Sequence, residues 1–339
     1  MRTLSTLKWS VISVLMISAL LIAAHYIYFV IPVARTGDPV TITIKPGTPV
    51  SGIAEDLLKA GVIDNPGLLK FLARVRRADR HLKAGRYEFA ANQPEPLALA
   101  MLVKGGVTGE RVTIPEGLTL EQTASLYRQR TSTDSSEFVS LTTNPALIES
   151  LGVRAASLEG YLFPDTYDIP WGMPSSSIIR MMVARLFDVI GEEHRQHLNR
   201  MEYTLHEVLT MASMVEREAK IPEERPLIAG VLYNRLRRGM LLQCDATVQY
   251  SLPECKELLT YADLEFQSPY NTYLHYGLPP GPIGNPGEGA ILAALYPEET
   301  DYLYYVARGE GSHIFSRTQQ EHARAKVQAR IDRQATRRN

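Results

Sequence analysis

The sequence predicts an α+β protein: an N-terminal membrane-spanning helix, a small module of strands and helices, and a mainly helical C-terminal domain with a small β element. Three observations support this. Residues 9–31 form an apolar run, a strand, turn and helix pattern occurs twice before residue 130, and helical periodicity dominates the remainder. With 339 residues, the chain is long enough for one to three domains.

The apolar run reads WSVISVLMISALLIAAHYIYFVI and contains no Asp, Glu, Lys or Arg. A helix of this length spans a bilayer core of about 30 Å. Because Arg2 and Lys8 precede it, the positive-inside rule places residues 1–8 in the cytoplasm and the chain after Arg35 outside. A cleaved signal peptide is the alternative, since Ala23 and Ala24 are small. The run continues past them without an A-x-A site, so we expect an uncleaved single-pass anchor.

A small module is predicted after a short polar connection. Its elements are strands at 40–44 and 85–89 and helices at 50–60, 66–76 and 97–103. The segment Ile44-Lys45-Pro46-Gly47 is echoed by Ile114-Pro115-Glu116-Gly117, and an amphipathic helix follows each copy. The pattern resembles the LysM type of glycan-binding module, in which a helix docks on a small sheet. We therefore expect a LysM-like module with a connector over residues 36–155.

The stretch 205–220, LHEVLTMASMVEREAK, has the apolar spacing of a buried helix and ends in two carboxylates. Residues at i and i+2 of a helix point to different sides, so one at most of Glu216 and Glu218 faces a given cleft. A carboxyl among apolar neighbours loses solvation and its pKa rises, as a general acid near neutral pH requires. The periodicity does not choose between the two, and a solvated helix end is the simpler interpretation.

Two further stretches carry polar side chains suited to a ligand. In MLLQCDATVQY, Gln243 and Asp245 lie among apolar residues and need partners. In PYNTYLHYGLPPGPIGNPG, residues 269–287, Gly and Pro exclude regular structure and predict a long ordered loop. Its Tyr270, Asn271 and Tyr273 have the rings and polar groups that line a glycan groove.

The remaining elements follow from periodicity and turn signals. We expect a loop at 131–136 (TSTDSS), a buried turn in 158–167, helices at 177–190, 227–238, 289–296 and from 319 onward, and a hairpin pairing 302–306 with 313–315.

Charge and cysteine content limit the possible partners. The chain has 36 basic and 37 acidic residues, a formal net charge of -1, so nothing indicates a nucleic-acid partner. The two cysteines, Cys244 and Cys255, match no zinc signature, and we expect no metal and no cofactor. Whether they pair or stay free is open.

Several motifs, taken in their order along the chain, resemble those of the endolytic murein transglycosylases of the MltG (YceG-like) family. They are LEGYLFPDTY, LTMASMVEREA, VLYNRLRRGMLLQCDATVQY, SPYNTYLHYGLPPGPIGNPG and YLYYVARGEGSHIFS. The resemblance covers nearly the whole chain. It implies a single-pass inner-membrane enzyme whose catalytic domain, residues 156–339, has a lysozyme or transglycosylase-like fold and lies in the periplasm. It also implies cleavage within nascent peptidoglycan strands, which limits their elongation, and peptidoglycan synthases as partners.

The family's catalytic glutamate is the second of the E-x-E pair, which maps to Glu218. The resemblance implies that Glu218 protonates the oxygen of the β-1,4 bond between MurNAc and GlcNAc and then deprotonates the C6 hydroxyl, leaving a 1,6-anhydro-MurNAc end. Tyr270, Asn271 and Tyr273 would hold the sugar, and Gln243 and Asp245 would orient the site. Many relatives have Asp-Pro where this chain has Asp245-Ala246, which puts that local turn in question.

Three alternatives stay open at this point. A hydrolytic muramidase would use a second carboxylate, Glu216, Asp245 or Asp165, to hold a water molecule. A catalytically silent scaffold would bind glycan or proteins of the cell-wall synthesis machinery. A metallopeptidase fits less well, because the H-E-x-x-H pattern begun by His206 ends in Thr210.

Overall fold

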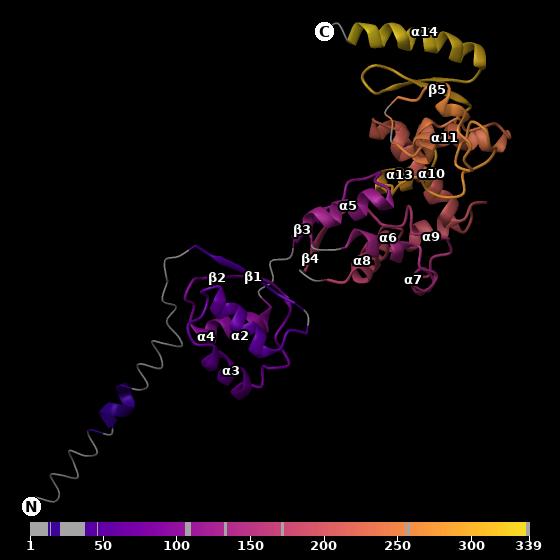
Figure 1. The fold of residues 1–339 in the computed structure, drawn as a ribbon. Coiled ribbons are helices and arrows are strands. Elements are labelled where there is room, and N and C mark those ends of the chain that lie inside the picture. Colours follow the sequence, from indigo (N-terminus) through magenta and orange to yellow (C-terminus); the bar gives the residue numbers. More distant parts are fainter. Residues whose placement is uncertain are drawn as a thin grey trace, which may run out of the picture. The chain divides into compact units, whose positions relative to one another are not determined.

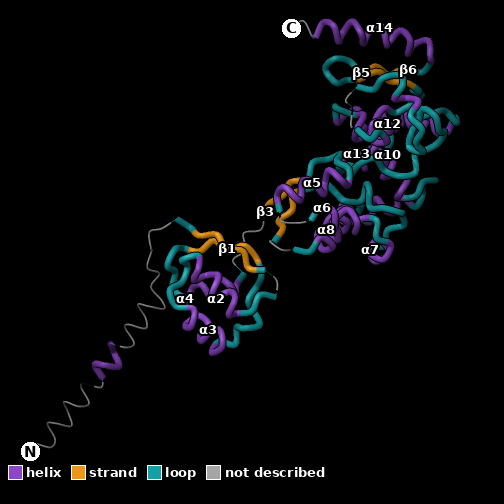
Figure 2. The backbone as a smooth tube through the Cα atoms, viewed as in Figure 1, coloured by secondary structure: helices purple, strands orange, loops and turns teal. Residues whose placement is uncertain are grey.

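The structure is a computed structural model, and it divides the chain into two compact units (Figures 1 and 2). The first comprises residues 1–110 and 168–172, and the second comprises residues 111–167 and 173–339. The described residues are 13, 15–20, 38–45, 47–105, 110–131, 134–170, 173–254, 256 and 258–336.

The predicted membrane span, residues 9–31, lies mostly outside the described residues. Residues 15–20 are helical, and Leu15, Met16, Ile17 and Leu20 have exposed side chains. Among the helices of the described ranges, none combines the length and apolar character needed to cross a bilayer.

The first unit contains a two-stranded antiparallel sheet and three helices. Strand β1 (Val40–Ile44) pairs with β2 (Gly85–Phe89), and Ile42 lies opposite Tyr87. The helices are α2 (Val50–Lys59), α3 (Pro66–Val75) and α4 (Glu95–Lys104). These elements confirm the predicted strands and helices of this region.

One apolar core holds the first unit together. It combines the inner face of the sheet with the apolar faces of the helices, through Ile44, Ile53, Leu57, Leu69, Tyr87, Phe89, Leu99 and Leu102 among others. The rings of Tyr87 and Phe89 stack with centroids 5.6 Å apart, and the Tyr87 hydroxyl donates to the Lys83 carbonyl at 2.6 Å. The large aromatic side chains of β2 thus fill the centre of a small unit without leaving a polar group unsatisfied.

The second unit is mainly helical, as expected. Its helices are α5 (Leu120–Arg130), α6 (Ser135–Thr142), α7 (Pro145–Ser150), α8 (Ser175–Val189), α9 (Glu192–Leu198), α10 (Leu205–Glu218), η1 (Pro222–Glu224), α11 (Arg225–Arg237), α12 (Asp245–Ser251), η2 (Asp263–Glu265), α13 (Glu288–Leu295) and α14 (Gln319–Thr336). Its β element is the antiparallel hairpin of β5 (Tyr304–Ala307) and β6 (His313–Ser316), which confirms the predicted hairpin.

Helix α10 is the centre of this unit. It packs against α11, α12 and α13, and every residue from Val208 to Val215 is buried. Figure 1 shows α10 between α11 and α13. Its first turn is closed by a capping box, in which Thr204 accepts from the Glu207 amide and Glu207 accepts from the Thr204 amide. The helix ends at Glu218 because Ala219 is extended.

The loop 269–287 has no regular structure, as predicted, yet most of its second half is buried. Asn285 ties it to two other segments. Its side chain accepts from the Leu162 amide at 3.0 Å and donates to the Leu118 carbonyl at 2.9 Å. Its backbone bonds both Gly117 and Leu118, so the loop is fastened to the segment before α5 and to the turn after Leu158.

Two predictions near the connector were correct only in part. The segment TSTDSS is not a loop throughout, because Asp134 caps α6 by accepting from the Ser136 amide at 2.9 Å. The turn at 158–167 runs into a strand, β4 (Thr166–Ile169), which pairs with β3 (Glu110–Thr113). The two strand, turn and helix copies therefore belong to different sheets, β1 with β2 and β3 with β4. The boundary between the module with its connector, residues 36–155, and the catalytic domain, residues 156–339, stays a prediction.

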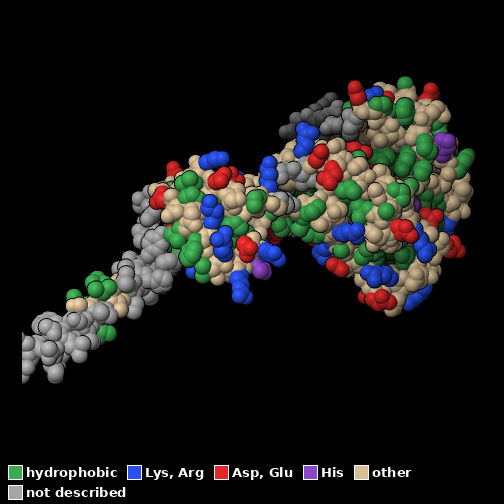
Figure 3. All heavy atoms as spheres, turned by 60° about the horizontal axis from the view of Figure 1, so that its bottom comes forward, with side chains coloured by type: hydrophobic (Ala, Val, Ile, Leu, Met, Phe, Trp, Pro, Cys, Tyr) green, Lys and Arg blue, Asp and Glu red, His purple; other side chains and the backbone are tan. Residues whose placement is uncertain are grey.

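The surface mixes both signs of charge. On the face drawn in Figure 3, Lys and Arg side chains lie interspersed with Asp and Glu over the described residues. This pattern agrees with the formal net charge of -1. Such a face has no long-range attraction for a polyanion.

Replacing Asn285 by alanine is expected to destabilise the protein. The Leu162 amide loses its acceptor inside the protein, and the Leu118 carbonyl loses one of its donors. We expect the free energy of unfolding to fall by about 2 kcal/mol or more, measured by urea unfolding. The exposed Asn199 serves as control, and Asn199→Ala should change stability by less than about 0.5 kcal/mol. Equal effects of the two variants would contradict the role given to Asn285.

Candidate active site

Glu218, the last residue of α10, lines a cavity of about 460 Å³. The cavity lies among the end of α10, the start of α12, the β5–β6 hairpin and helix α14. Its lining residues are Glu218, Arg235, Leu242, Gln243, Asp245, Tyr273, Tyr305, Val306, Ala307, His313, His322, Lys326 and Arg333. A carboxyl group in a polar cavity of this size can reach a bound ligand.

Two side chains hold the Glu218 carboxyl in place. The Cys244 thiol donates to Oε1 at 2.9 Å, and the Tyr305 hydroxyl donates to Oε2 at 3.2 Å. Burial raises the pKa of Glu218 above its usual range, and the nearby Asp245 charge raises it further, while the two hydrogen bonds oppose this. The carbonyl end of α10 also disfavours a negative charge there. Glu218 is thus an oriented carboxyl group that retains its proton at higher pH than usual.

Glu216 has a different environment. Its side chain is 8% exposed and forms an ion pair with Arg225 at 2.9 Å, and it accepts from the Gly287 amide at 3.0 Å. Burial raises the pKa of Glu216, while the Gly287 amide and Arg225 favour its charged form. Arg225 also reaches Glu116 at 3.3 Å. Glu216 therefore joins the end of α10 to α11 and to the loop, and it does not line the Glu218 cavity.

Three of the five predicted substrate-binding residues line the same cavity as Glu218: Gln243, Asp245 and Tyr273. The Tyr273 hydroxyl donates to Asp245 Oδ1 at 2.5 Å. Asp245 is the first residue of α12, and Gln243 adopts a left-handed backbone with φ of 52°. Helix α12 forms from Asp245 onward with Ala246 as its second residue, so the missing proline does not prevent the turn.

The other two lie elsewhere. Asn271 is fully buried, and its amide donates to the carbonyls of Leu264 and Phe266 at 2.9 and 2.8 Å. Its side-chain oxygen accepts from the Tyr273 amide at 2.9 Å, so it shapes the segment that presents Tyr273. Tyr270 packs its ring against Tyr250, with centroids 5.0 Å apart.

Sequence reasoning missed both partners of Glu218. Cys244 lies between two predicted site residues and is a buried free thiol, and Cys255 is outside the described residues. The position of Cys244 between Gln243 and Asp245, two polar residues that need partners, was the one sequence signal that could have indicated its role. Tyr305 comes from β5, 87 residues after Glu218, and nothing local marks it. Tertiary contact alone brings it to the carboxyl group.

The hairpin is fixed beside Glu218 by a second carboxylate. Glu224 accepts from the backbone amide of His313 at 3.0 Å and contacts its Nδ1 at 2.6 Å. The His313 ring meets the Tyr305 ring edge to face at 5.4 Å. Glu224 thus holds β6 against the segment after α10, and this contact keeps Tyr305 within reach of Glu218.

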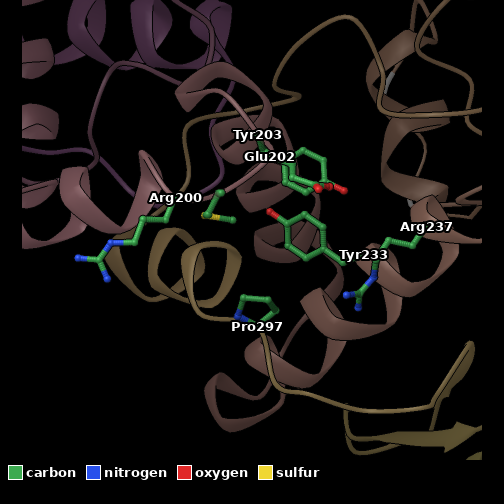
Figure 4. Close-up of a pocket in the computed structure, with 7 residues that line it drawn as sticks. Arg200, Glu202, Tyr203, Tyr233, Arg237 and Pro297 are labelled. Carbon is green, nitrogen blue, oxygen red and sulfur yellow. The ribbon is translucent and has the colours of Figure 1, made fainter.

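Another cavity, of about 280 Å³, lies at the opposite end of α10. It is lined by Arg200, Met201, Glu202, Tyr203, Tyr233, Arg237 and Pro297. Figure 4 shows the rings of Tyr203 and Tyr233 close together, with Arg200 and Arg237 on either side. The Tyr233 hydroxyl is already bonded to the Ala294 carbonyl at 3.0 Å. None of the predicted site residues lines this cavity.

The comparisons with known proteins agree with this geometry. An oriented carboxyl group with a raised pKa defines an acid–base site on an α+β fold. The sequence model of the YceG-like family matches residues 42–328, and the chain belongs to this family. The predicted family is therefore confirmed.

Two named relatives and one solved structure are similar over most of the chain. The endolytic murein transglycosylase of Bacillus subtilis is 35% identical over 85% of this chain and 84% of its own length. That of Streptococcus pneumoniae is 33% identical over 94% of this chain and 65% of its own length. A crystal structure of a YceG-like protein from Listeria monocytogenes matches with a TM-score of 0.59 and 34% identity, over 85% of this chain and 99% of that one. The prediction of an enzyme of the lytic transglycosylase class is confirmed.

Another buried carboxyl group of the second unit, Glu159, allows a test of stability against pH. Glu159 is 4% exposed, accepts from the Leu120 amide at 3.2 and 3.3 Å and from the Tyr250 hydroxyl at 3.3 Å. Burial raises the pKa of Glu159 to about 8, although the Leu120 amide opposes this. The folded state therefore binds a proton that the unfolded state releases above about 4.5, and its stability falls as the pH rises towards 8.

We expect Glu159→Gln to flatten this dependence, because the amide does not ionise. Between pH 5 and 8, the variant should lose about 1–4 kcal/mol less stability than the wild type, measured by urea unfolding at a series of pH values. Glu149→Gln at an exposed position, which is not among the groups that shift the pKa of Glu159, is the control and should keep the wild-type slope. An unchanged slope in Glu159→Gln would refute the raised pKa.

Proposed function

We propose that this chain cuts glycan strands of murein internally and leaves 1,6-anhydro-MurNAc ends, with Glu218 as the catalytic acid and base. One observation carries the proposal. Glu218 is a carboxyl group with a raised pKa, held by two donors in the cavity that also contains Gln243, Asp245 and Tyr273. The relatives named as endolytic murein transglycosylases support the choice of substrate.

In the first step, protonated Glu218 gives its proton to the oxygen that links MurNAc to GlcNAc, and the C1–O4 bond breaks. A raised pKa favours this step, because the acid must hold its proton near neutral pH. The carboxylate that forms is then stabilised by the hydrogen bonds from Cys244 and Tyr305. The same two donors thus limit the cost of the charged intermediate state.

In the second step, the Glu218 carboxylate takes the proton of the C6 hydroxyl of the same MurNAc, and O6 bonds to C1. This restores protonated Glu218 and consumes no water. Because nucleophile and electrophile belong to one sugar, the effective concentration of the hydroxyl is high. The Tyr273 and Asp245 pair, 2.5 Å apart, and Gln243 supply polar groups that orient the ring. Asn271 supports the site indirectly, because its side-chain oxygen accepts from the Tyr273 amide at 2.9 Å.

Hydrolysis is the closest alternative. Asp245 lines the cavity with Glu218 and is the carboxylate that could hold a water molecule. Glu216 is committed to Arg225 and the Gly287 amide, and Asp165 forms an ion pair with Arg185 at 2.7 Å. A 1,6-anhydro end is lighter than a reducing end by one water, so mass spectrometry of the products separates the two reactions. A silent scaffold would give no new ends at all.

The place of action follows from the apolar run. We propose that residues 9–31 anchor the enzyme as a single span in the inner membrane, with residues 1–8 cytoplasmic and the catalytic domain, residues 156–339, periplasmic. There it would meet strands as peptidoglycan synthases release them, and its cuts would limit strand elongation. The element order β1, α2, α3, β2 supports a LysM-like glycan-binding role for the module within residues 36–155.

Glu218→Gln should abolish cleavage of purified murein, with a loss of at least about a thousandfold, because the amide cannot donate the proton. Glu216→Gln is the matched comparison two residues away. It should retain most of the activity but unfold more easily, because Arg225 loses its buried partner. Soluble products are counted by chromatography and weighed by mass spectrometry. Equal loss of activity in two well-folded variants would defeat the assignment.

Tyr305→Phe should change the pH dependence of the reaction. The Tyr305 hydroxyl favours the charged form of Glu218, so its removal raises the pKa of Glu218 further. Activity needs protonated Glu218 and is lost as pH rises above that pKa, so the alkaline limb of kcat/KM should move up by about one pH unit. Tyr304→Phe on the adjacent residue should leave the limb in place. A shift to lower pH would disprove the role of this hydrogen bond.

A further inference from the structure

Helix α14 turns three basic side chains towards the Glu218 cavity. His322, Lys326 and Arg333 are separated by four and seven residues, which places them on one face of the helix. All three line the cavity. Ala325 and Ala329 on the same face are buried, and α14 packs on both strands of the hairpin. Small residues at these positions let the helix lie close to the hairpin and bring its basic groups to the rim.

These groups have few partners of their own. In the part of the chain that the structure describes, neither Lys326 nor Arg333 forms an ion pair, and the Nε of Arg333 donates only to the Ala329 carbonyl at 3.2 Å. Nδ1 of His322 is buried and has no hydrogen-bond partner. A buried nitrogen atom without a partner is uncommon.

Arg235, which also lines the cavity, already donates to backbone carbonyls. Arg235 donates from Nε to the Leu303 carbonyl at 2.6 Å and from Nη1 to the Leu242 carbonyl at 2.8 Å. Burial lowers the pKa of His322, with Lys326 and Arg235 adding to the effect. The face of α14 is therefore the part of the cavity with donors to spare, and an anionic group of the ligand would satisfy them.

The carboxyl groups of the cavity come from other elements. Glu218 ends α10 and Asp245 begins α12, whereas the basic groups lie on α14, so the cavity has carboxyl groups that suit a neutral sugar and basic groups that suit an anion. A ligand with both kinds of group would lie in one orientation only, because reversal would bring its anion against Asp245. A murein strand has both, since its muramic sugars carry a lactyl arm that ends in a carboxylate or in a peptide with carboxylates.

We propose that His322, Lys326 and Arg333 bind a carboxylate on the lactyl arm or its peptide, and so select a charged muramic sugar for the site. The inference rests on the proposed function, because it takes murein as the substrate. The three residues are binding residues that set which sugar lies beside Glu218. They take no part in the proton transfers.

The test measures binding in the full chain carrying Glu218→Gln, so that strands stay intact. Three strand preparations are compared: native strands, strands whose carboxylates have been converted to amides with carbodiimide and ammonia, and strands stripped of peptide by an amidase. For native strands, adding Lys326→Glu and Arg333→Glu should raise the Kd about tenfold. For amidated strands, the same changes should alter the Kd less than twofold. The tenfold effect should shrink as salt is added.

The matched control is Arg324→Glu. It reverses one charge, as each change of the double variant does, two residues from His322, where the helix has turned by about 200° to the other side. Its effect on the Kd of native strands should be less than twofold. An effect equal to that of the double variant would mean that the overall charge of α14 matters and not the cavity face, and this would overturn the inference. So would a tenfold effect on amidated strands.

The stripped strands identify the carboxylate. In strands that carry peptide, the lactyl carboxyl group is held in the amide to the peptide, and the amidase sets it free. A tenfold effect that survives stripping shows that the site also binds the freed lactyl carboxylate, and one that disappears assigns the peptide carboxylates alone; either supports the inference. The proposed function is tested separately. It fails if the wild-type protein binds strands but produces no new strand ends. If the wild type cleaves murein and the double variant binds all three preparations as before, the inference fails alone.

Discussion

The desolvation of one carboxyl group at the end of a buried helix organises the catalytic unit. Glu218 is the last residue of α10, whose residues from Val208 to Val215 are all buried. The helix therefore cannot turn to expose its end, and the carboxyl group must find partners inside the protein. Cys244 and Tyr305 provide them. They come from α12's cap and from β5, so the same constraint determines where those two elements lie.

The two glutamates of the E-x-E pair have different roles, which helical periodicity alone did not assign. Glu216 is satisfied by a strong ion pair with Arg225 and by the Gly287 amide, which fasten α11 and the long loop to α10. Glu218 receives only neutral donors and faces a cavity. The Arg225 guanidinium favours the charged form of Glu216 and opposes the effect of its burial, whereas Glu218 has no cationic partner in hydrogen-bond contact among the described residues. The difference between a structural and a reactive carboxyl group therefore lies in the partners.

Local patterns were enough for much of the fold. Apolar periodicity predicted β1, β2 and most of the long helices, because burial of one face is encoded at fixed intervals. Short elements failed where a polar residue acts as a cap. Asp134 begins α6 in a stretch that composition marks as a loop, and Thr166–Ile169 becomes a strand because β3 lies beside it. The candidate site was predictable in part. Gln243, Asp245 and Tyr273 line the cavity, whereas the side-chain amide of Asn271 donates to two backbone carbonyls.

The sequence by itself determined the α+β class, the family and the pair of carboxyl groups, because each rests on residue type and spacing along the chain. Only the tertiary structure decided which carboxyl group faces the cavity, that Tyr305 and Cys244 hold it, and that α14 presents Lys326 to the same space. Side chains that meet across 87 residues leave no periodic trace, since their contact depends on how helices and the hairpin pack and not on their own neighbours.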